Sequence, residues 1–492
     1  MFGRVFGVLI SIASIRVYTT LLSSTEVGRL NILLAISGWF WLALISPVAM
    51  YVSLKIINWV REGLAYKYLF SFLKYLFIIA GLAIVSVAAI KYSIGIGIDI
   101  KISWLLALIS GSILLTIGSM IFVSYLNFLG YRLWYVILTS LTLGISLAIS
   151  AFFVLKIGGK AEYWMSGQLL GQFLILIVTF AILFRMLRQL PVAIKSGDND
   201  RSFTFPVVLK FAWPVAIGII LYWIHTQGYR FVFQKIAGIE TLGLFAVGFG
   251  IGSNLMVSFD GLFNQYYQPI FYNEIANGTK EQRTIAWNKY AHAFFPAIIL
   301  VVLYIAVNGS LIAKIFTGEK FHQVGNIILW GALAEGLRMM TSTTSMVAHA
   351  QFETKPLILP SVTGAVSAIT GIFLFARNYP FIGSGVSLTI GWLLALIHMY
   401  SKMKRLLSIQ MPWRRIFYSL ILGIPLVVVF IVRGNTLLTP TIFQSLIILC
   451  ISGLYLLFAQ YILARKWVSL PIKVPLIDNL EQKIKLYFYR EI

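Results

Sequence analysis

Long apolar runs separated by short polar breaks recur along the whole chain. A run of about 20 apolar residues can cross the ~30 Å hydrocarbon core of a bilayer as an α-helix, in which the backbone polar groups satisfy one another. The pattern therefore predicts an all-α polytopic membrane protein with about 14 transmembrane helices. We expect these helices over residues 3–22, 30–54, 69–91, 103–127, 134–155, 163–184, 206–229, 241–266, 291–312, 325–349, 357–376, 383–401, 416–432 and 441–463.

Composition agrees with a membrane protein, since 59% of the 492 residues are hydrophobic and 11% are charged, far from the usage of soluble domains. The net charge of +23 does not indicate nucleic acid, because the basic residues lie in short loops beside the spans and not in one aromatic-rich patch. About two thirds of the basic residues fall on the side that holds both termini. The positive-inside rule therefore predicts that both termini are cytoplasmic.

Polar breaks divide the chain into five expected parts. The longest break between spans contains a proline, a glycine and several turn formers, which is typical of a linker. We predict an N-lobe over 1–185 (helices 1–6), a cytoplasmic inter-lobe loop over 186–205, a C-lobe over 206–402 (helices 7–12), helices 13 and 14 over 403–463, and a cytoplasmic tail over 464–492. The tail has the pattern of a membrane-surface amphipathic segment, with a partner-binding site as the alternative.

Metal and thiol chemistry have little support in the sequence. The single cysteine, Cys450, excludes an intrachain disulfide and a cysteine metal site. The five histidines are scattered without the spacing of metal ligands. We therefore expect no catalytic residues, no metal and no cofactor.

An internal repeat relates the two halves. In "SIRVYTTLLSSTEVGRL", Arg16 precedes Glu26 by ten residues, and in "YRFVFQKIAGIETLGLF", Arg230 precedes Glu240 by the same interval. A glycine and a long apolar run follow each glutamate. Six spans per copy give both copies the same orientation, so the pseudo-two-fold axis runs along the membrane normal. We expect two six-helix lobes around a central cavity, with Arg16 and Arg230 approaching it from opposite lobes.

Three segments resemble the polysaccharide-transporter branch of the multidrug/oligosaccharidyl-lipid/polysaccharide exporter superfamily, the Wzx-type flippases. They are "RVYTTLLSSTEVGRLNILLAISGWF", the stretch from "FAWPVAIGIILYWIHTQGYRFVF" to "FDGLFNQYYQPIF", and the stretch from "GEKFHQVGNIILWGALAEGLRMM" to "FIGSGVSLTIG". The resemblance covers roughly residues 1–400. Helices 13 and 14 occur in only some members of that family.

The resemblance implies alternating access around a cavity with cationic residues. The cargo that the resemblance implies is a polyprenyl-pyrophosphate-linked oligosaccharide, a precursor of O-antigen, capsule or exopolysaccharide, which moves from the cytoplasmic to the outer leaflet. It also implies location in the bacterial inner membrane, with the lipid bilayer, and in some systems a polysaccharide polymerase and chain-length proteins, as partners. Transport is expected to draw on an H⁺ or Na⁺ gradient or on the membrane potential.

Such an anionic cargo calls for fixed cations in the cavity. Arginine suits this task because its planar fork holds phosphate bidentately and its charge survives burial. The candidates are Arg16, Arg230, Arg338 and Lys55, with Lys210 nearer the cytoplasmic mouth. The alternatives are structural: Arg16 pairs with Glu26, Arg230 pairs with Glu240, and Glu335 neutralises Arg338 three residues further along the same helix.

Polar residues within the predicted spans supply the remaining candidates. Asn254, Ser258 and Gln265 share one face of helix 8, and Tyr222 and His225 share one face of helix 7, so both faces are candidates for sugar contact. A core histidine is the alternative for His225. An intramembrane carboxylate is a functional candidate by default, which makes Asp260 and Glu335 candidates for ion coupling, with simple interhelical hydrogen bonding as the alternative. These seven residues complete the predicted site.

Other functions remain open at this stage. A flippase for the lipid-linked peptidoglycan precursor is a close alternative, and a multidrug/cation antiporter is a more distant one, because cationic drugs call for an acidic cavity. A membrane polysaccharide polymerase or glycosyltransferase is the alternative of a different class. Every predicted outer loop is short and offers few acids, so we expect a transporter and no enzyme.

Overall fold

The computed structural model describes residues 2–93, 99–189, 204–276, 278–351, 353, 355–434 and 440–467, and these residues contain helices and no strands. The N-lobe consists of α1 (Phe2–Leu21), α2 (Ser24–Trp39), η1 (Phe40–Ile45), α3 (Ser46–Arg61), α4 (Ala65–Ser93), α5 (Ile102–Gly111), η2 (Ser112–Ile117), α6 (Gly118–Phe128), α7 (Arg132–Lys156) and α8 (Ala161–Gln189).

The second half of the chain forms the C-lobe and two further helices. Its elements are α9 (Phe205–Trp223), η3 (Ile224–Gly228), α10 (Tyr229–Ala237), α11 (Ile239–Ala276), α12 (Lys280–Val307), α13 (Gly309–Phe316), η4 (Glu319–Val324), α14 (Gly325–Ala350), η5 (Lys355–Leu357), α15 (Ile358–Phe375), α16 (Pro380–Met403), α17 (Trp413–Gly434) and α18 (Ile442–Trp467). Within the described residues, the predicted inter-lobe loop retains only its two ends and the predicted tail only residues 464–467.

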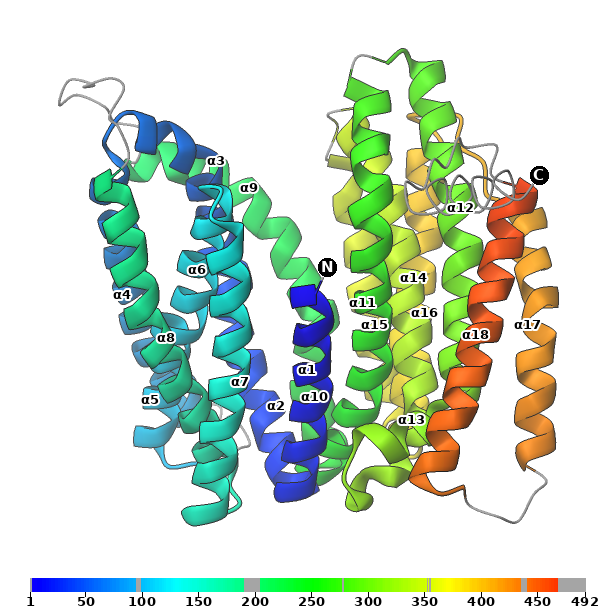
Figure 1. Ribbon diagram of the computed structural model, residues 1–492, viewed down its shortest axis with the longest axis horizontal. Coiled ribbons are helices and arrows are strands. Elements are labelled where there is room, and N and C mark those ends of the chain that lie inside the picture. Colours follow the sequence, from blue (N-terminus) through cyan, green and yellow to red (C-terminus); the bar gives the residue numbers. More distant parts are fainter. Residues whose placement is uncertain are drawn as a thin grey trace, which may run out of the picture.

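Several of these elements join into single membrane spans. By length and apolarity the described residues contain 11 spans, or 12 when the bent pair Pro206–Trp213 and Val215–Ala237 counts as one. Counting the shorter apolar helix α1 and the more polar helix α14 as spans gives the fourteen predicted. The spans form two lobes, and α17 and α18 lie at the outside of the second lobe (Figure 1). The predicted all-α, two-lobe fold is confirmed.

Several spans are longer than their apolar windows. The second span begins at Ser24, six residues before the predicted start, and runs through η1 to Arg61. The Ser23 hydroxyl accepts a hydrogen bond from the Glu26 backbone N–H at 3.3 Å and so caps this start. The eighth span, α11, likewise extends ten residues beyond the predicted end. Capping and polar residues therefore continue these helices past the hydrocarbon-length segment that hydropathy detects.

The two lobes meet at one end of the helix bundle and diverge toward the other (Figure 1). We call the end where α1 finishes and α2 begins the closed side, and the end where α3 finishes and α4 begins the open side. Helix α9 links the lobes because its first half packs against α3 and η1 of the N-lobe, with the Tyr51 and Phe211 rings 5.6 Å apart. The span bends by 47° at position 214, a proline, as expected when a helix loses a backbone donor.

Helices α17 and α18 pack on α12 and extend the C-lobe outward. One side chain of α12 and one of α18 form hydrogen bonds across the α12–α18 contact: Tyr304 donates to the Leu449 carbonyl at 3.1 Å, and Gln460 donates to the Ala297 carbonyl at 3.1 Å. Asn308, which follows α12, donates to Ser452 at 3.3 Å. These bonds satisfy polar groups that lipid would leave unpaired, so they fix α18 to the C-lobe.

Candidate functional site

At the closed side, α2 and α11 cross with backbone in contact with backbone. A Cβ atom on Gly28 would lie 2.1 Å from the Ile239 carbonyl oxygen, and one on Gly243 would lie 1.9 Å from the Ser24 carbonyl oxygen. Both distances are far inside van der Waals contact, so neither position accommodates a side chain in this arrangement. Glycine at these two positions permits the close helix approach that joins the lobes.

Arg16 forms a second contact between the lobes. Its guanidinium donates to the carbonyls of Lys314 at 2.6 Å, of Ile315 at 3.3 Å and of Thr317. These carbonyls lie at the C-terminal end of α13, where a helix has unsatisfied acceptors and partial negative charge. Arg16 therefore caps α13 across the lobe boundary and does not pair with Glu26.

The surrounding backbone reinforces this contact. The Gly318 N–H donates to the Thr19 hydroxyl at 2.9 Å, and a Cβ on Gly318 would lie 2.7 Å from the Thr19 carbonyl oxygen. Thr19 and Thr317 are both fully buried. Sequence reasoning missed these two threonines, because nothing in the local pattern shows which loop of the other lobe will cover them.

Arg230 makes the equivalent contact in the opposite direction. Its guanidinium, on α10 of the C-lobe, donates to the Asn31 carbonyl of α2 at 3.2 Å. Glu240 accepts a hydrogen bond from the Ser24 hydroxyl at 3.0 Å, again between lobes. Glu26 instead bonds within the N-lobe, to Arg29 at 2.7 Å and to the Ala161 N–H at 2.8 Å. The repeated arginines thus brace the lobes through backbone carbonyls and not through the repeated glutamates.

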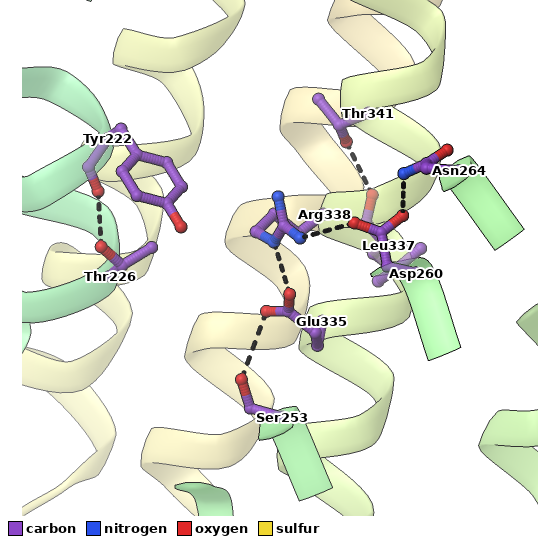
Figure 2. A network of polar contacts seen from close by, with 9 residues as sticks. All are labelled: Tyr222, Thr226, Ser253, Asp260, Asn264, Glu335, Leu337, Arg338 and Thr341. Atoms are coloured by element: carbon purple, nitrogen blue, oxygen red, sulfur yellow. Dashed lines mark hydrogen bonds and ion pairs between the residues drawn. The ribbon is translucent and has the colours of Figure 1, made fainter. Parts of the chain in front are cut away.

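Arg338 lies in a polar network inside the C-lobe (Figure 2). Its Nε donates to Glu335 Oε1 at 2.6 Å, and its Nη2 lies 3.7 Å from Asp260 Oδ2 on α11. Ser253 on α11 donates to the other oxygen of Glu335 at 3.3 Å. Two carboxylates therefore surround one guanidinium, and with all three groups ionised the cluster carries one net negative charge. This neutralisation favours the structural alternative for Arg338.

The network continues toward α12 and α9. Asn264 donates to Asp260 Oδ1 at 2.6 Å, and the Tyr290 hydroxyl of α12 donates to Asn264 Oδ1. Tyr222 on α9 is 40% exposed, and its hydroxyl is turned toward the Arg338 cluster (Figure 2). Asp260, Glu335, Arg338 and Tyr222, predicted separately from three different spans, are thus brought together.

The polar face of α11 is largely uncovered by the rest of the protein. Asn254, Gly261 and Gln265 are exposed and Ser258 is half-buried, with its hydroxyl bonded to the Asn254 carbonyl at 2.9 Å. Figure 1 places α11 at the edge of the C-lobe that faces the N-lobe. A polar face within a membrane span is costly against lipid and is expected to border water or a polar ligand.

His225 lies in the interior of the C-lobe, with 2% of its surface exposed. Its ring stacks on Trp392 with centroids 4.0 Å apart and an interplanar angle of 14°. A Cβ atom on Gly391 would lie 3.0 Å from its Nε2, which shows how closely α16 approaches the ring. These contacts favour the core-histidine alternative over contact with a substrate.

Lys55 differs from the other three predicted cavity cations. It is half-buried on α3, and it makes no hydrogen bond or ion pair within the described part of the chain. Lys210 on α9 is exposed. The described residues contain no group of three or more His, Cys, Asp or Glu side chains arranged to hold a metal ion.

Comparisons with known proteins relate the chain to transporters by fold. No protein-family model matches the chain, and no curated protein sequence matches it. Among solved structures, it resembles the lipid II flippase MurJ in an inward closed conformation, with a TM-score of 0.68 and 17% identity over 94% of this chain and 97% of that one.

Transporters of a second kind also match. Multidrug resistance MATE family transporters of the MOP superfamily match with TM-scores of 0.61 (inward-facing, 12% identity, 81% of this chain and 94% of that one) and 0.56 (outward-facing, 15% identity, 82% and 93%). At these identities the likeness establishes the fold alone. The chain therefore has the two-lobe fold of MOP superfamily transporters.

Proposed function

We propose that this protein is a flippase that moves a polyprenyl-pyrophosphate-linked oligosaccharide from the cytoplasmic to the outer leaflet of a bacterial inner membrane by alternating access. The observation that carries the proposal is the polar face of α11, with Asn254 and Gln265 exposed on the side of the C-lobe toward the N-lobe. Hydroxyl and amide groups on such a face suit the hydroxyl-rich head of a saccharide.

In this proposal Lys55 provides the first contact for the pyrophosphate. Arg16 and Arg230 are engaged at the closed side and Arg338 is neutralised by two carboxylates, whereas Lys55 has no partner within the described residues. A lysine acts as a point charge that tolerates headgroups of varied geometry. The open side then faces the cytoplasm, in agreement with the excess of basic residues in its loops.

The driving force in this proposal is electrostatic. A membrane potential that is negative inside favours outward movement of an anion by about 2.3 kcal/mol per charge per 100 mV. Asp260 and Glu335 remain the proposed sites for a coupling H⁺ or Na⁺, because a cation bound there would offset the one net negative charge of the Arg338 cluster. The protein in this proposal is a transporter and not an enzyme.

The proposal is tested by reconstitution into liposomes with a fluorescent polyprenyl-pyrophosphate oligosaccharide, whose accessibility in each leaflet is followed with and without a potential. We expect the wild type to flip this lipid, Lys55→Gln and Gln265→Leu to slow flipping at least about tenfold at low substrate, and Lys280→Gln to have no effect. Lys280 is an exposed lysine of the same open side, at the start of α12, so it controls for a general loss of charge. Absence of flipping by a correctly folded wild type with several saccharide heads would refute the proposal.

A second candidate is a flippase for the lipid-linked peptidoglycan precursor, and the observation that favours it is the likeness to the structure named as a lipid II flippase over almost the whole of both chains. The same assay with both cargoes in competition separates the two. Preference for the peptidoglycan precursor would replace the oligosaccharide in the proposal.

A further inference from the structure

His322 lies at the closed side, directly beside the Arg16 contact. It belongs to η4, the short helix between α13 and α14, which lies outside the membrane-spanning segments. The Thr317 backbone, whose carbonyl accepts a hydrogen bond from Arg16 of the other lobe, lies close enough to the His322 ring to favour its protonated form. The Nε2 of His322 is buried and has no hydrogen-bond partner among the described residues. The His322 imidazole therefore lies near the Arg16 guanidinium at the lobe boundary.

Charged residues lie near His322 on η4 itself and on two of the four helices that pack against it. Arg16 on α1 and Lys314 on α13 are positive, and Glu319 lies on η4 itself. Helices α11 and α14 also pack there, but Glu240 at the start of α11 is bonded to Ser24, and the first ionisable residue of α14, Glu335, lies about three turns into that helix. Burial, followed by the charges of Arg16 and Lys314, holds the pKa of His322 below its ordinary value.

We propose that protonation of His322 releases the Arg16 contact and opens the closed side, so that this histidine makes the gate responsive to protons on that side. The inference rests on the proposed alternating access. The imidazolium would place a third positive charge beside those of Arg16 and Lys314, with no carboxylate of the described residues in bonding contact with it. Separation of α1 from η4 removes Arg16 from that neighbourhood.

The direction of the effect follows from linkage. A group whose pKa is depressed in the closed state and restored in the open state binds its proton more tightly in the open state, so lower pH favours opening. One linked proton changes the open-to-closed ratio by at most about tenfold per pH unit. The reverse direction, with acid closing this side, contradicts the inference.

The experiment measures the distance across the closed side as a function of pH. Ile157 at the end of α7 and Asn378 between α15 and α16 are exposed, uncharged positions of the two lobes at this side, and replacing the single Cys450 by Ala provides a cysteine-free background. Spin labels at Ile157→Cys and Asn378→Cys in the full chain, reconstituted in nanodiscs, report the separation. We expect the long-distance population of the wild type to grow as pH falls from about 8 to about 5.

Variants separate His322 from other titrating groups. His322→Gln is expected to stay closed over this range, and His322→Lys to be open at every pH. His292 is the matched control, because it too has a buried, unpartnered Nε2 and lies beside an arginine, Arg415, but within the C-lobe. His292→Gln should keep the wild-type response. A pH response that persists in His322→Gln, or a wild type that does not open in acid, would overturn the inference.

The outcome is distinguishable from failure of the proposed function. A chain that flips the lipid-linked oligosaccharide but whose closed side ignores pH refutes this inference alone. A protein whose closed side opens in acid through His322 but that moves no lipid-linked saccharide refutes the proposed cargo and supports the inference about His322.

Discussion

Gly28 and Gly243 occupy equivalent places in the crossing of α2 and α11. Gly28 faces the carbonyl of Ile239, four residues before Gly243, and Gly243 faces the carbonyl of Ser24, four residues before Gly28. The contact is therefore reciprocal, as expected for two copies of one repeat related by a pseudo-two-fold axis. The same axis relates Arg16 and Arg230, each of which donates to backbone carbonyls of the opposite lobe.

The first prediction concerns this crossing. Gly28→Val and Gly243→Val should prevent the close approach of α2 and α11, because even a Cβ atom would lie about 2 Å from a backbone oxygen. We expect the lobes of both variants to separate at the closed side, which the distance between the spin labels at Ile157→Cys and Asn378→Cys measures. Gly261→Ala on α11 is the control, since a Cβ there meets nothing within 4 Å. Normal closure in both valine variants would show that the crossing is not required.

The second prediction concerns the cap that Arg16 places on α13. Arg16→Ala should lower the free energy of unfolding by about 2 kcal/mol, because it removes charge-assisted hydrogen bonds and leaves buried carbonyls unsatisfied. Lysine has a single donor centre in place of the guanidinium fork, so the free energy of unfolding of Arg16→Lys should lie between those of the wild type and Arg16→Ala. Equilibrium unfolding in detergent measures the difference. Arg377→Gln, an exposed arginine of the α15–α16 turn, should change it by less than about 0.5 kcal/mol.

The third prediction concerns the Arg338 cluster. Arg338→Met leaves one buried carboxylate, Glu335, and one half-buried carboxylate, Asp260, without their cation and should cost about 3–5 kcal/mol of stability. Adding Glu335→Gln to that variant should restore part of the loss, because it removes one of the uncompensated charges. Chemical denaturation of the single and double variants measures this coupling. Strictly additive effects would show that the two side chains do not act as a pair.

An exposed ion pair serves as the reference for the cluster. Lys289 and Glu274 lie 3.5 Å apart with side chains that are 52% and 34% exposed. Glu274→Gln should cost less than about 1 kcal/mol, as is usual for solvent-screened pairs.

The fourth prediction separates His225 from Tyr222, two residues of one helical face. His225→Phe should lower stability, because it disturbs the stack on Trp392 and the close packing against α16, and should leave the substrate concentration for half-maximal flipping unchanged. Tyr222→Phe should leave stability nearly unchanged and alter transport, since its hydroxyl is turned toward the Arg338 cluster. The reverse pattern would exchange the two roles.

The sequence by itself determined the class of this protein, because apolar runs of bilayer length leave the backbone no alternative to helices. It also determined the pairing of the halves, since Arg16, Glu26 and Gly28 recur as Arg230, Glu240 and Gly243. Glu335 as the partner of Arg338 was also within reach, because residues three apart share a helix face.

Only the tertiary structure decided which partners the repeated arginines take. Arg16 meets carbonyls about 300 positions away, and the α13–η4 segment that supplies them has no local pattern that marks it as a cap for another lobe. Asp260 joins Arg338 only because α11 and α14 pack together, and His225 of η3 meets Trp392 only because α16 approaches it closely. Hydropathy and periodicity report how each helix divides between apolar and polar faces, whereas the partner of a polar side chain depends on packing between distant segments.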